Sequence, residues 1–263
     1  MVNFFTFAQS LYYHISNRLV FCMAKIIAIS NFKGGVGKTT SSVNIAAAFA
    51  QLGKKTLVID LDPQFNLTRC LGVKSVKSIY GALRGEYPAP IVERSLNLHV
   101  LPSALELIKA ETEFVSEYKR EEKLNQLLKP IAEHYDYIII DCPPSLGVLS
   151  QMAYTSADFI FVPIQSEYLA LTGYGVLNEA LDRIGLEIDA AFVTQYDQRQ
   201  ILDRSILEKL NSTIGDKLLK SIIRQNVAVA EATTRGEHIF EYAPTSNGAQ
   251  DYKVLSAELL AKF

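Results

Sequence analysis

The chain alternates short apolar runs with longer amphipathic stretches over most of its length. Residues 26–29, 57–59 and 138–140 are apolar runs without a charged residue, which is typical of parallel strands buried on both faces. A helical pattern of apolar positions follows the first run at residues 43–50. Because strand-like and helix-like segments alternate, the sequence predicts an α/β fold. We expect a mostly parallel, twisted sheet with helices on both faces.

One domain accounts for most of the chain. The 263 residues, 49% of them hydrophobic, are enough for a large α/β core, and no linker, repeat or low-complexity tract divides residues 23–263. Residues 1–22 differ, because they hold six aromatic residues, one arginine and no acidic residue. We predict a disordered extension or an over-extended start there; a helix lying on a membrane surface is the alternative, since apolar residues recur at helical spacing.

Composition restricts the function classes. The three cysteines, Cys22, Cys70 and Cys142, are far apart in sequence, which suits a reducing cytosol and argues against disulfides or an iron–sulfur cluster. No apolar stretch reaches the roughly 20 residues that a membrane-spanning helix needs. The net charge of −2 gives no overall basic footprint for nucleic acid. These features predict a cytoplasmic protein.

A glycine-rich loop separates the first apolar run from the helical pattern. Residues 32–40 read F-K-G-G-V-G-K-T-T, and a strand, such a loop and a helix in this order form a phosphate-binding loop. Glycines let several N–H groups converge, and the helix N-terminus adds its positive dipole end. Lys38 can then reach the β- and γ-phosphates, and the Thr39 hydroxyl can ligate Mg²⁺.

Acidic residues end the second and third runs. Asp60 and Asp62 share one face of a strand at its carboxyl end, where ligands of open α/β sheets bind. Beside a phosphate site, such acids can hold Mg²⁺-bound water and orient the attacking water. Asp141 has the place of the carboxylate that holds Mg²⁺ in phosphate-loop enzymes, and Pro143 and Pro144 stop its strand and stiffen the next loop. We call residues 60–66 and 141–147 the first and second switch segments.

The motifs together resemble one family. The common pattern G-x-x-x-x-G-K-[ST] is not met, because Phe32 replaces its first glycine and Lys33 precedes the glycine pair. The segment resembles the deviant Walker A motif K-G-G-x-G-K-[ST] of the ParA/MinD/Soj family of dimerising ATPases. The first switch segment resembles the family's D-x-D-P-Q-G-N, with Phe65 in place of glycine, and the second matches D-x-P-P-S-L-G. Further similar blocks lie at residues 163–171, 194–199 and 230–250.

The resemblance implies a slow ATPase that uses ATP and Mg²⁺ and forms a homodimer with ATP. Lys33 would cross to the phosphates of the partner subunit, in the manner of an arginine finger. Lys33, Lys38 and Asp62 are the expected catalytic residues, and Thr39, Asp60 and Asp141 the expected magnesium ligands. The expected nucleotide-binding residues are Lys33, Gly34, Gly35, Val36, Gly37, Lys38, Thr39 and Thr40.

The motifs do not identify the cargo on which such an ATPase would act. A ParA-like ATPase would bind DNA non-specifically as an ATP dimer, associate with the nucleoid, and be released when a ParB-like protein stimulates hydrolysis. The alternative is a MinD-like membrane-associated positioning ATPase; the chain ends soon after its last predicted helix, without the amphipathic tail of that class. Arg199 and Arg224 are the candidate DNA contacts. The family's I-P-R-N-V-R segment reads I-R-Q-N-V-A at residues 223–228.

Overall fold

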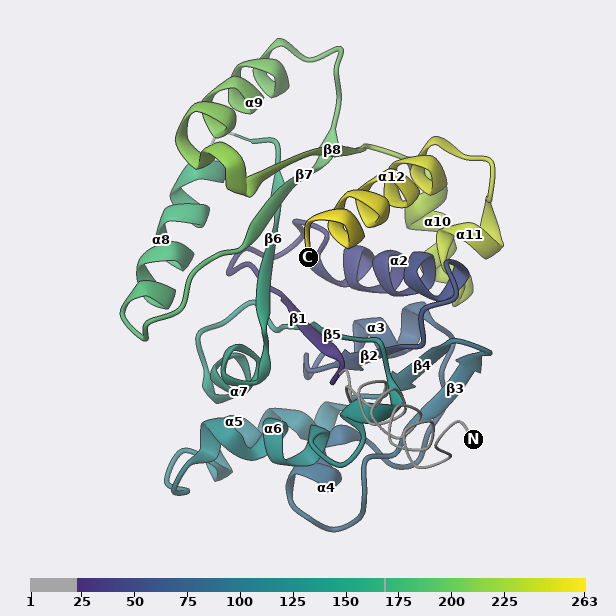
Figure 1. Ribbon diagram of the computed structural model, residues 1–263, viewed down its shortest axis with the longest axis vertical. Coiled ribbons are helices and arrows are strands. Elements are labelled where there is room, and N and C mark those ends of the chain that lie inside the picture. The colour runs from purple at the N-terminus through teal and green to yellow at the C-terminus, as the bar shows by residue number, and fades with distance from the viewer. Residues whose placement is uncertain (1–22, 168) are drawn as a thin grey trace, which may run out of the picture.

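The computed structural model describes residues 23–167 and 169–263, and an eight-stranded sheet forms its centre (Figure 1). The spatial order of the strands is β3-β4-β2-β5-β1-β6-β7-β8, and all neighbouring pairs are parallel except β3 with β4. This confirms the predicted α/β fold with a mostly parallel sheet. The strands are β1 (Lys25–Ile29), β2 (Thr56–Asp60), β3 (Val92–Ser95), β4 (Leu98–Leu101), β5 (Tyr137–Asp141), β6 (Phe159–Gln165), β7 (Ala190–Tyr196) and β8 (Leu218–Arg224).

Helices cover both faces of the sheet and enclose two separate apolar cores. One core is closed by α4 (Ile79–Leu83), α5 (Ala110–Glu113), α6 (Lys123–Leu128), α7 (Val148–Ser156), α8 (Ala170–Asp182) and α9 (Ile201–Ile214). The other is closed by α2 (Lys38–Gln51), α3 (Asn66–Cys70), α10 (Val227–Arg235), α11 (Ile239–Tyr242) and α12 (Asn247–Lys262). The described residues also form short 3₁₀ helices, which are η1 (Leu105–Lys109), η2 (Arg120–Glu122), η3 (Ala132–His134) and η4 (Gly215–Lys217).

The central strands show why the sequence contains unbroken apolar runs. In β5, Ile138 and Ile140 enter the first core, whereas Ile139 between them enters the second. All three are fully buried, because successive side chains of a strand point to opposite faces. A strand covered on both faces therefore has no position for a polar side chain until it reaches the edge of the sheet.

The strand register brings the three predicted motifs together. Asp141 at the end of β5 is the partner of Ile29 on one side and of Asp60 on the other. The glycine-rich loop begins directly after Ile29, and the first switch segment begins at Asp60. The carboxyl edge of the sheet thus joins the loop and both switch segments, which is the expected ligand position in an open α/β sheet.

Two predictions made from the sequence fall partly or wholly outside this description. The proposed N-terminal extension, residues 1–22, lies outside the described residues, and the domain boundary at residue 23 stays a prediction. Among the helices of residues 23–167 and 169–263, none has both the length and the apolar character needed to cross a bilayer.

Candidate nucleotide-binding site

The phosphate loop, residues 30–37, leads from β1 into α2. Gly35 and Gly37 have φ values of 79° and 88°, a left-handed backbone that side chains with a Cβ rarely adopt. Gly37 occupies the N-cap position of α2, where no side chain of the described chain accepts a hydrogen bond from the first turn. The first N–H groups of α2 are therefore available to an anion.

Residues at the end of β7 fix the shape of this loop. The Thr194 hydroxyl donates a hydrogen bond of 2.8 Å to the carbonyl of Val36, and the Gln195 amide donates to the carbonyl of Gly35. These bonds hold the loop carbonyls in place, and the N–H groups of residues 34–37 are left for a ligand. Sequence reasoning marked residues 194–199 as a family block but did not predict that they support the phosphate loop.

Lys38 is buried against the loop that precedes it. Its ammonium group donates a hydrogen bond of 2.9 Å to the carbonyl of Lys33, and the residue is 7% exposed. Burial lowers the pKa of Lys38, and the nearby carboxylates of Asp141 and Asp62 oppose that shift. The charge is thus held inside the loop, where phosphate oxygens could replace a backbone carbonyl as its partner.

Asp141 joins the sheet to the first turn of α2. Thr39 donates a hydrogen bond of 2.7 Å to its Oδ2, and Ser42 donates one of 3.0 Å to its Oδ1. Burial raises the pKa of Asp141 to about 8, and the neighbouring Asp60 contributes to the rise. Sequence reasoning missed Ser42, although its position one turn after Thr39 on the same helix could have revealed it.

This donor set fits magnesium. A hydroxyl and a carboxylate lie in contact beside a phosphate site, and Mg²⁺ prefers few protein oxygens together with phosphates and water. Among the described residues, no cluster of three or more His, Cys, Asp and Glu side chains could hold a metal without such help. Thr39 and Asp141 are therefore the residues that would hold the ion.

Asp60 binds protein groups with both oxygens. Its Oδ2 accepts hydrogen bonds of 2.8 Å from the Thr68 N–H and 2.6 Å from the Thr68 hydroxyl, while Oδ1 accepts one of 3.3 Å from the Asp62 N–H. Burial raises the pKa of Asp60 to about 7, although the bonds from Thr68 lower it. Asp60 thus holds α3 against β2, and its predicted role in magnesium binding stays a prediction.

Asp62 lies at a cavity between the two switch segments. Its Oδ1 accepts a hydrogen bond of 2.9 Å from the Gln64 N–H, and its carbonyl accepts one of 2.9 Å from the Ser103 hydroxyl. A cavity of about 320 Å³ is lined by Asp62 together with Pro143 and other residues of the second switch segment. The structure therefore brings the predicted water-orienting acid and the proline-stiffened loop to one opening.

Glu111 is a residue of this region that sequence reasoning missed. From α5, its Oε2 accepts a hydrogen bond of 2.7 Å from the Val148 N–H at the start of α7, which places negative charge at the positive end of that helix. A Cβ atom built on Gly147 would lie 2.2 Å from the same oxygen. A side chain at the last glycine of the second switch segment would therefore displace the Glu111 carboxylate from the start of α7.

The backbone at Phe65 is informative because this residue replaces the glycine of the family pattern. The residue is the N-cap of α3 and has φ 46° and ψ 35°, a left-handed conformation that favours glycine. The guanidinium of Arg69 lies 4.0 Å from the centre of the Phe65 ring, a cation–π contact that offsets part of the backbone cost. The backbone here matches what glycine would adopt, although the side chain does not.

Lys33 lies at the partly exposed edge of the phosphate loop. Its N–H donates a hydrogen bond of 3.0 Å to Oδ1 of Asn31, which fixes the backbone before the glycine pair. Its ammonium group forms an ion pair with Glu167, and its side chain is 37% exposed. The second lysine of the motif is thus accessible from outside and bound to an acid of its own chain.

A mostly apolar cavity of about 390 Å³ opens beside the loop, and we call it the base cavity. Such walls next to a phosphate site suit a flat aromatic ring. Sequence reasoning noted the changed segment 223–228 but not this cavity. Its lining residues are Gly37, Thr40, Thr194, Gln195, Ile223, Arg224, Gln225, Asn226, Val227, Val229, Ala230 and Tyr252.

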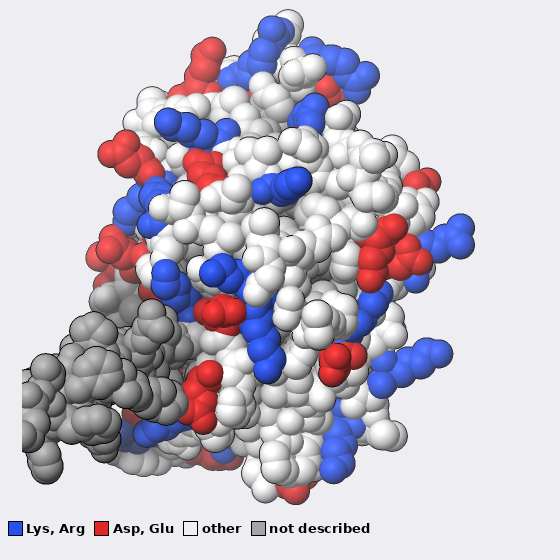
Figure 2. All heavy atoms as spheres, turned by 45° about the vertical axis from the view of Figure 1, so that its right-hand side comes forward, with Lys and Arg blue, Asp and Glu red and all other residues white. Residues whose placement is uncertain are grey.

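Arg199 and Arg224, the predicted DNA contacts, line a second, polar cavity of about 450 Å³. Each forms an ion pair of its own: Arg199 with Asp197 at 2.7 Å, and Arg224 with Asp251 at 2.6 Å. Their side chains are 85% and 40% exposed. On the face shown in Figure 2, basic and acidic side chains are interspersed, without a large patch of one sign.

Comparison with known proteins identifies the family. Residues 24–194 match the family described as "AAA domain". Over 251 residues, the chain is 39% identical to the sporulation initiation inhibitor protein Soj of Bacillus subtilis. The matched region covers 91% of this chain and 99% of that protein. It is 37% identical to the chromosome-partitioning ATPase Soj of Treponema pallidum, over 91% of this chain and 98% of the relative. The chain belongs to the Soj/ParA family of ATPases.

Solved structures agree with this assignment. The septum site-determining protein MinD of Pyrococcus horikoshii, complexed with Mg-ADP, superposes with a TM-score of 0.77 at 28% identity, covering 91% of this chain and 98% of MinD. Cobyrinic acid a,c-diamide synthase of Mycobacterium smegmatis, with bound ADP and magnesium, gives 0.79 at 30% identity, covering 90% and 94%. Membership in the Soj/ParA family confirms the predicted ATPase, and these ligands agree with the predicted ATP and Mg²⁺.

The conformation of Phe65 leads to a stability prediction. We expect Phe65→Gly to be more stable than Phe65→Ala by about 1 kcal/mol, because alanine keeps the left-handed strain without the ring contact. Urea unfolding of both variants measures the difference. The same pair of changes at Gln64, an exposed neighbour whose backbone is not left-handed, should favour alanine. Alanine being the better residue at both positions would contradict the prediction.

The raised pKa values of Asp60 and Asp141, about 7 and about 8, lead to a pH prediction. An unfolded carboxyl has a pKa near 4, so between about pH 4 and pH 8 the folded state binds more protons than the unfolded state. Raising the pH through this window should therefore destabilise the nucleotide-free protein, by up to about 1.4 kcal/mol per pH unit for each group.

Urea unfolding between pH 5 and pH 8 tests this expectation. Asp141→Asn should flatten the decline, whereas Asp216→Asn, at an exposed carboxyl of η4, should keep it. Equal slopes for wild type and Asp141→Asn would show that Asp141 is ionised throughout.

Proposed function

We propose that this chain is an ATP-dependent dimerising switch that partitions or positions DNA or another cargo. ATP would assemble the dimer, and hydrolysis stimulated by a ParB-like partner would dissolve it. The observation that carries this proposal is Lys33, a second lysine at the exposed edge of a phosphate loop whose other lysine is already buried within it. Its position suits a charge supplied to a neighbouring subunit. Two relatives named as chromosome-partitioning proteins support the cargo class.

The other roles follow from the positions of the side chains. The N–H groups of residues 34–40 and the ammonium group of Lys38 would bind the phosphates, and Thr39 and Asp141 would hold Mg²⁺. The metal ion would neutralise charge that develops on the transferring phosphoryl group. Asp62, at the opening between the switch segments, would orient the attacking water. Asp60 would act near the ion through its position beside Asp141.

The ion pair between Lys33 and Glu167 would have to open before Lys33 could contact a phosphate of another subunit. Both side chains are partly exposed, at 37% and 32%, and such ion pairs contribute about 0–1 kcal/mol. A triphosphate carries more charge than one carboxylate, and like a carboxylate it accepts charge-assisted hydrogen bonds from an ammonium group. We infer that phosphates of the nucleotide bound to a second subunit displace Glu167 from Lys33. Breaking this ion pair would add little to the free-energy cost of dimerisation.

DNA binding would depend on the dimer. Arg199 and Arg224 lie at one polar cavity, but Asp197 and Asp251 compensate their charge within a single subunit. Two copies side by side would double the local basic charge, and phosphates could then compete for these guanidinium groups. Binding of this kind would be non-specific, which agrees with nucleoid association only in the ATP state.

The MinD-like alternative would need a surface for membrane. The final helix, α12, buries Ala249, Tyr252, Leu255 and Leu259 in the second core. Its apolar face is therefore not free to lie on a bilayer. We keep the alternative as an outcome of the DNA experiment below.

Two lysine variants test the switch. Lys33→Ala should bind ADP nearly as wild type does, yet lose ATP-driven dimerisation and about 10³-fold or more of the hydrolysis rate. Lys38→Ala should instead weaken nucleotide binding by about tenfold or more, because it removes a buried charge from the phosphates. Fluorescent-nucleotide titration, light scattering and phosphate release measure the three properties. Normal turnover by Lys33→Ala would overturn the role in trans.

Binding to a random-sequence DNA duplex tests the cargo. We expect binding with ATP, but not with ADP or without nucleotide, and a steep decrease as salt rises, because phosphate contacts release counterions. Arg199→Ala should weaken binding equally on unrelated sequences and reduce the salt slope by about 1 for each lost contact. Arg183→Ala, at an exposed arginine paired with Glu179 on α8, is the control. ATP-dependent dimers that bind vesicles of anionic lipid and not DNA would favour the MinD-like alternative.

A further inference from the structure

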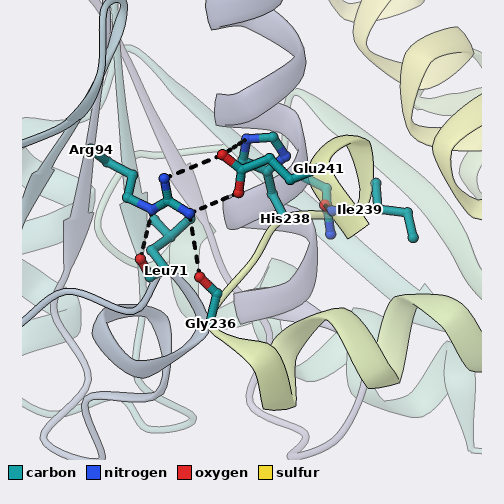
Figure 3. Close-up of polar contacts among 7 residues, drawn as sticks. Leu71, Arg94, Gly236, His238, Ile239 and Glu241 are labelled. Carbon is teal, nitrogen blue, oxygen red and sulfur yellow. Dashed lines mark hydrogen bonds and ion pairs between the residues drawn. The ribbon is translucent and has the colours of Figure 1, made fainter. Parts of the chain in front are cut away.

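Arg94 on β3 joins segments that are far apart in sequence (Figure 3). Its Nε donates a hydrogen bond of 2.8 Å to the carbonyl of Leu71, directly after α3, and one terminal nitrogen donates one of 3.4 Å to the carbonyl of Gly236, directly after α10. The two terminal nitrogens donate bonds of 3.2 and 2.7 Å to the carboxylate of Glu241 on α11. One guanidinium thus connects the ends of three helices.

The segments joined by Arg94 also meet through their backbones. Gly72 and Gly236 both have left-handed φ values, 63° and 73°. A Cβ on Gly236 would lie 3.0 Å from the Cα of Gly72, and a Cβ on Gly72 would lie 3.1 Å from the carbonyl oxygen of Gly236. Contact this close means that the C-terminal ends of α3 and α10 cannot move independently by more than a small distance.

On one side, this junction leads to the catalytic acids. Helix α3 has five residues, too few to be stable alone, so its position depends on what holds its ends. Near its middle, Thr68 donates two hydrogen bonds to Asp60, and Asp62 lies shortly before its start. Arg94 holds the other end through Leu71. A displacement of α3 would therefore move the groups around both acids.

On the other side, the junction leads to the base cavity. Helix α10 supplies Val227, Val229 and Ala230 to that cavity, yet Ala232 is the only residue of this helix that is fully buried. The next helix is fixed differently, because the Ile239 N–H donates a hydrogen bond of 2.9 Å to Asn44 of α2. Helix α10 is thus anchored by one fully buried residue, by partly buried Ala228 and Val229, and by a hydrogen bond of 3.0 Å from the Tyr242 hydroxyl to Glu231. Arg94 holds its C-terminal end.

The electrostatics make Arg94 the cation of the junction. His238 lies 3.4 Å from Glu241, but burial lowers the pKa of His238 and the nearby Arg94 lowers it further. The imidazole is therefore neutral near pH 7, and in the described part of the chain Arg94 is the cation paired with Glu241. Loss of the guanidinium would leave a carboxylate and two carbonyls without this donor, which would loosen the link between the segments.

We propose that Arg94 is a positioning residue that transmits occupancy of the base cavity to the segment carrying Asp60 and Asp62. A base bound against α10 fixes that helix, and Arg94 passes the constraint to α3 through the carbonyls of Gly236 and Leu71. Nucleoside triphosphate would then order the catalytic acids better than its phosphates alone. This inference rests on the assignment of the base cavity to the nucleotide.

Amide hydrogen exchange on the full chain tests the proposal with two ligands. Magnesium pyrophosphate would occupy only the phosphate site, whereas magnesium ADP would also occupy the base cavity. Their difference is the effect of the adenosine, which carries the base and is called the effect of the base below. In wild type, the base should slow exchange by about fivefold or more at residues 225–231 and also at residues 60–72, the lower end of common coupling between sites. In Arg94→Ala, the effect should persist at residues 225–231 and vanish at residues 60–72.

Further variants separate positioning from stability. Arg183→Ala, at an exposed arginine directly after α8, should behave as wild type. Should Arg94→Ala be poorly folded, Glu241→Gln keeps the bonds from Arg94 to Leu71 and Gly236, and it should retain the effect at residues 60–72. Arg94→Lys, which cannot reach both carbonyls at once, should lose that effect.

Each contrary result has a distinct meaning. No effect of the base at residues 225–231 in wild type would overturn the assignment of the cavity. An effect there without one at residues 60–72 would show that the two regions are not coupled. Effects at both places that persist in Arg94→Ala would show that the coupling passes elsewhere.

Discussion

Two buried carboxylates side by side are the constraint on which the site depends. The register of β2 and β5 pairs Asp60 with Asp141 at the carboxyl edge of the sheet, where neither is exposed. Burial makes ionisation of each unfavourable and raises both pKa values; repulsion from Asp60 adds to the rise at Asp141, and repulsion from Asp62 adds to the rise at Asp60. Positive charge near both acids relieves this conflict. Lys38 supplies part of it at Asp141, and the Mg²⁺ that would accompany a nucleotide would supply more, so binding would stabilise the folded state.

The same two carboxylates also organise the chain around them. Asp141 accepts hydrogen bonds from Thr39 and Ser42 and thereby sets the first turn of α2, whereas Asp60 accepts two from Thr68 and sets α3. A change in charge at this edge therefore changes the hydrogen bonds that hold two helices. The charge of the two acids and the position of the first switch segment are therefore coupled.

The sequence predicted those parts of the structure that depend on local pattern. Continuous apolar runs predicted the central strands, because strands covered on both faces permit no polar side chain, and the glycine-rich loop was recognisable from its flanking elements. Contacts formed by the topology were not predictable. Glu111 supports Val148 across 37 positions, and Thr194 reaches Val36 across 158. Phe65 lies between these cases: the sequence showed a departure from the family pattern, and only the backbone angle shows that the local conformation is the one glycine would adopt.

The pairing of the exposed cations connects the composition to the proposed switch. Lys33, Arg199 and Arg224 are the basic residues for which we propose contacts beyond the subunit, and each is paired with an acid of its own chain. A protein with unpaired cations at these positions would attract nucleic acid and nucleotide in every state, since long-range attraction depends on uncompensated charge. Pairs that are partly exposed cost little to break, so a doubly charged or polymeric phosphate can compete where a single anion cannot. A net charge of −2 is therefore compatible with binding to polyanions, because affinity would come from pairs that open together when two subunits meet.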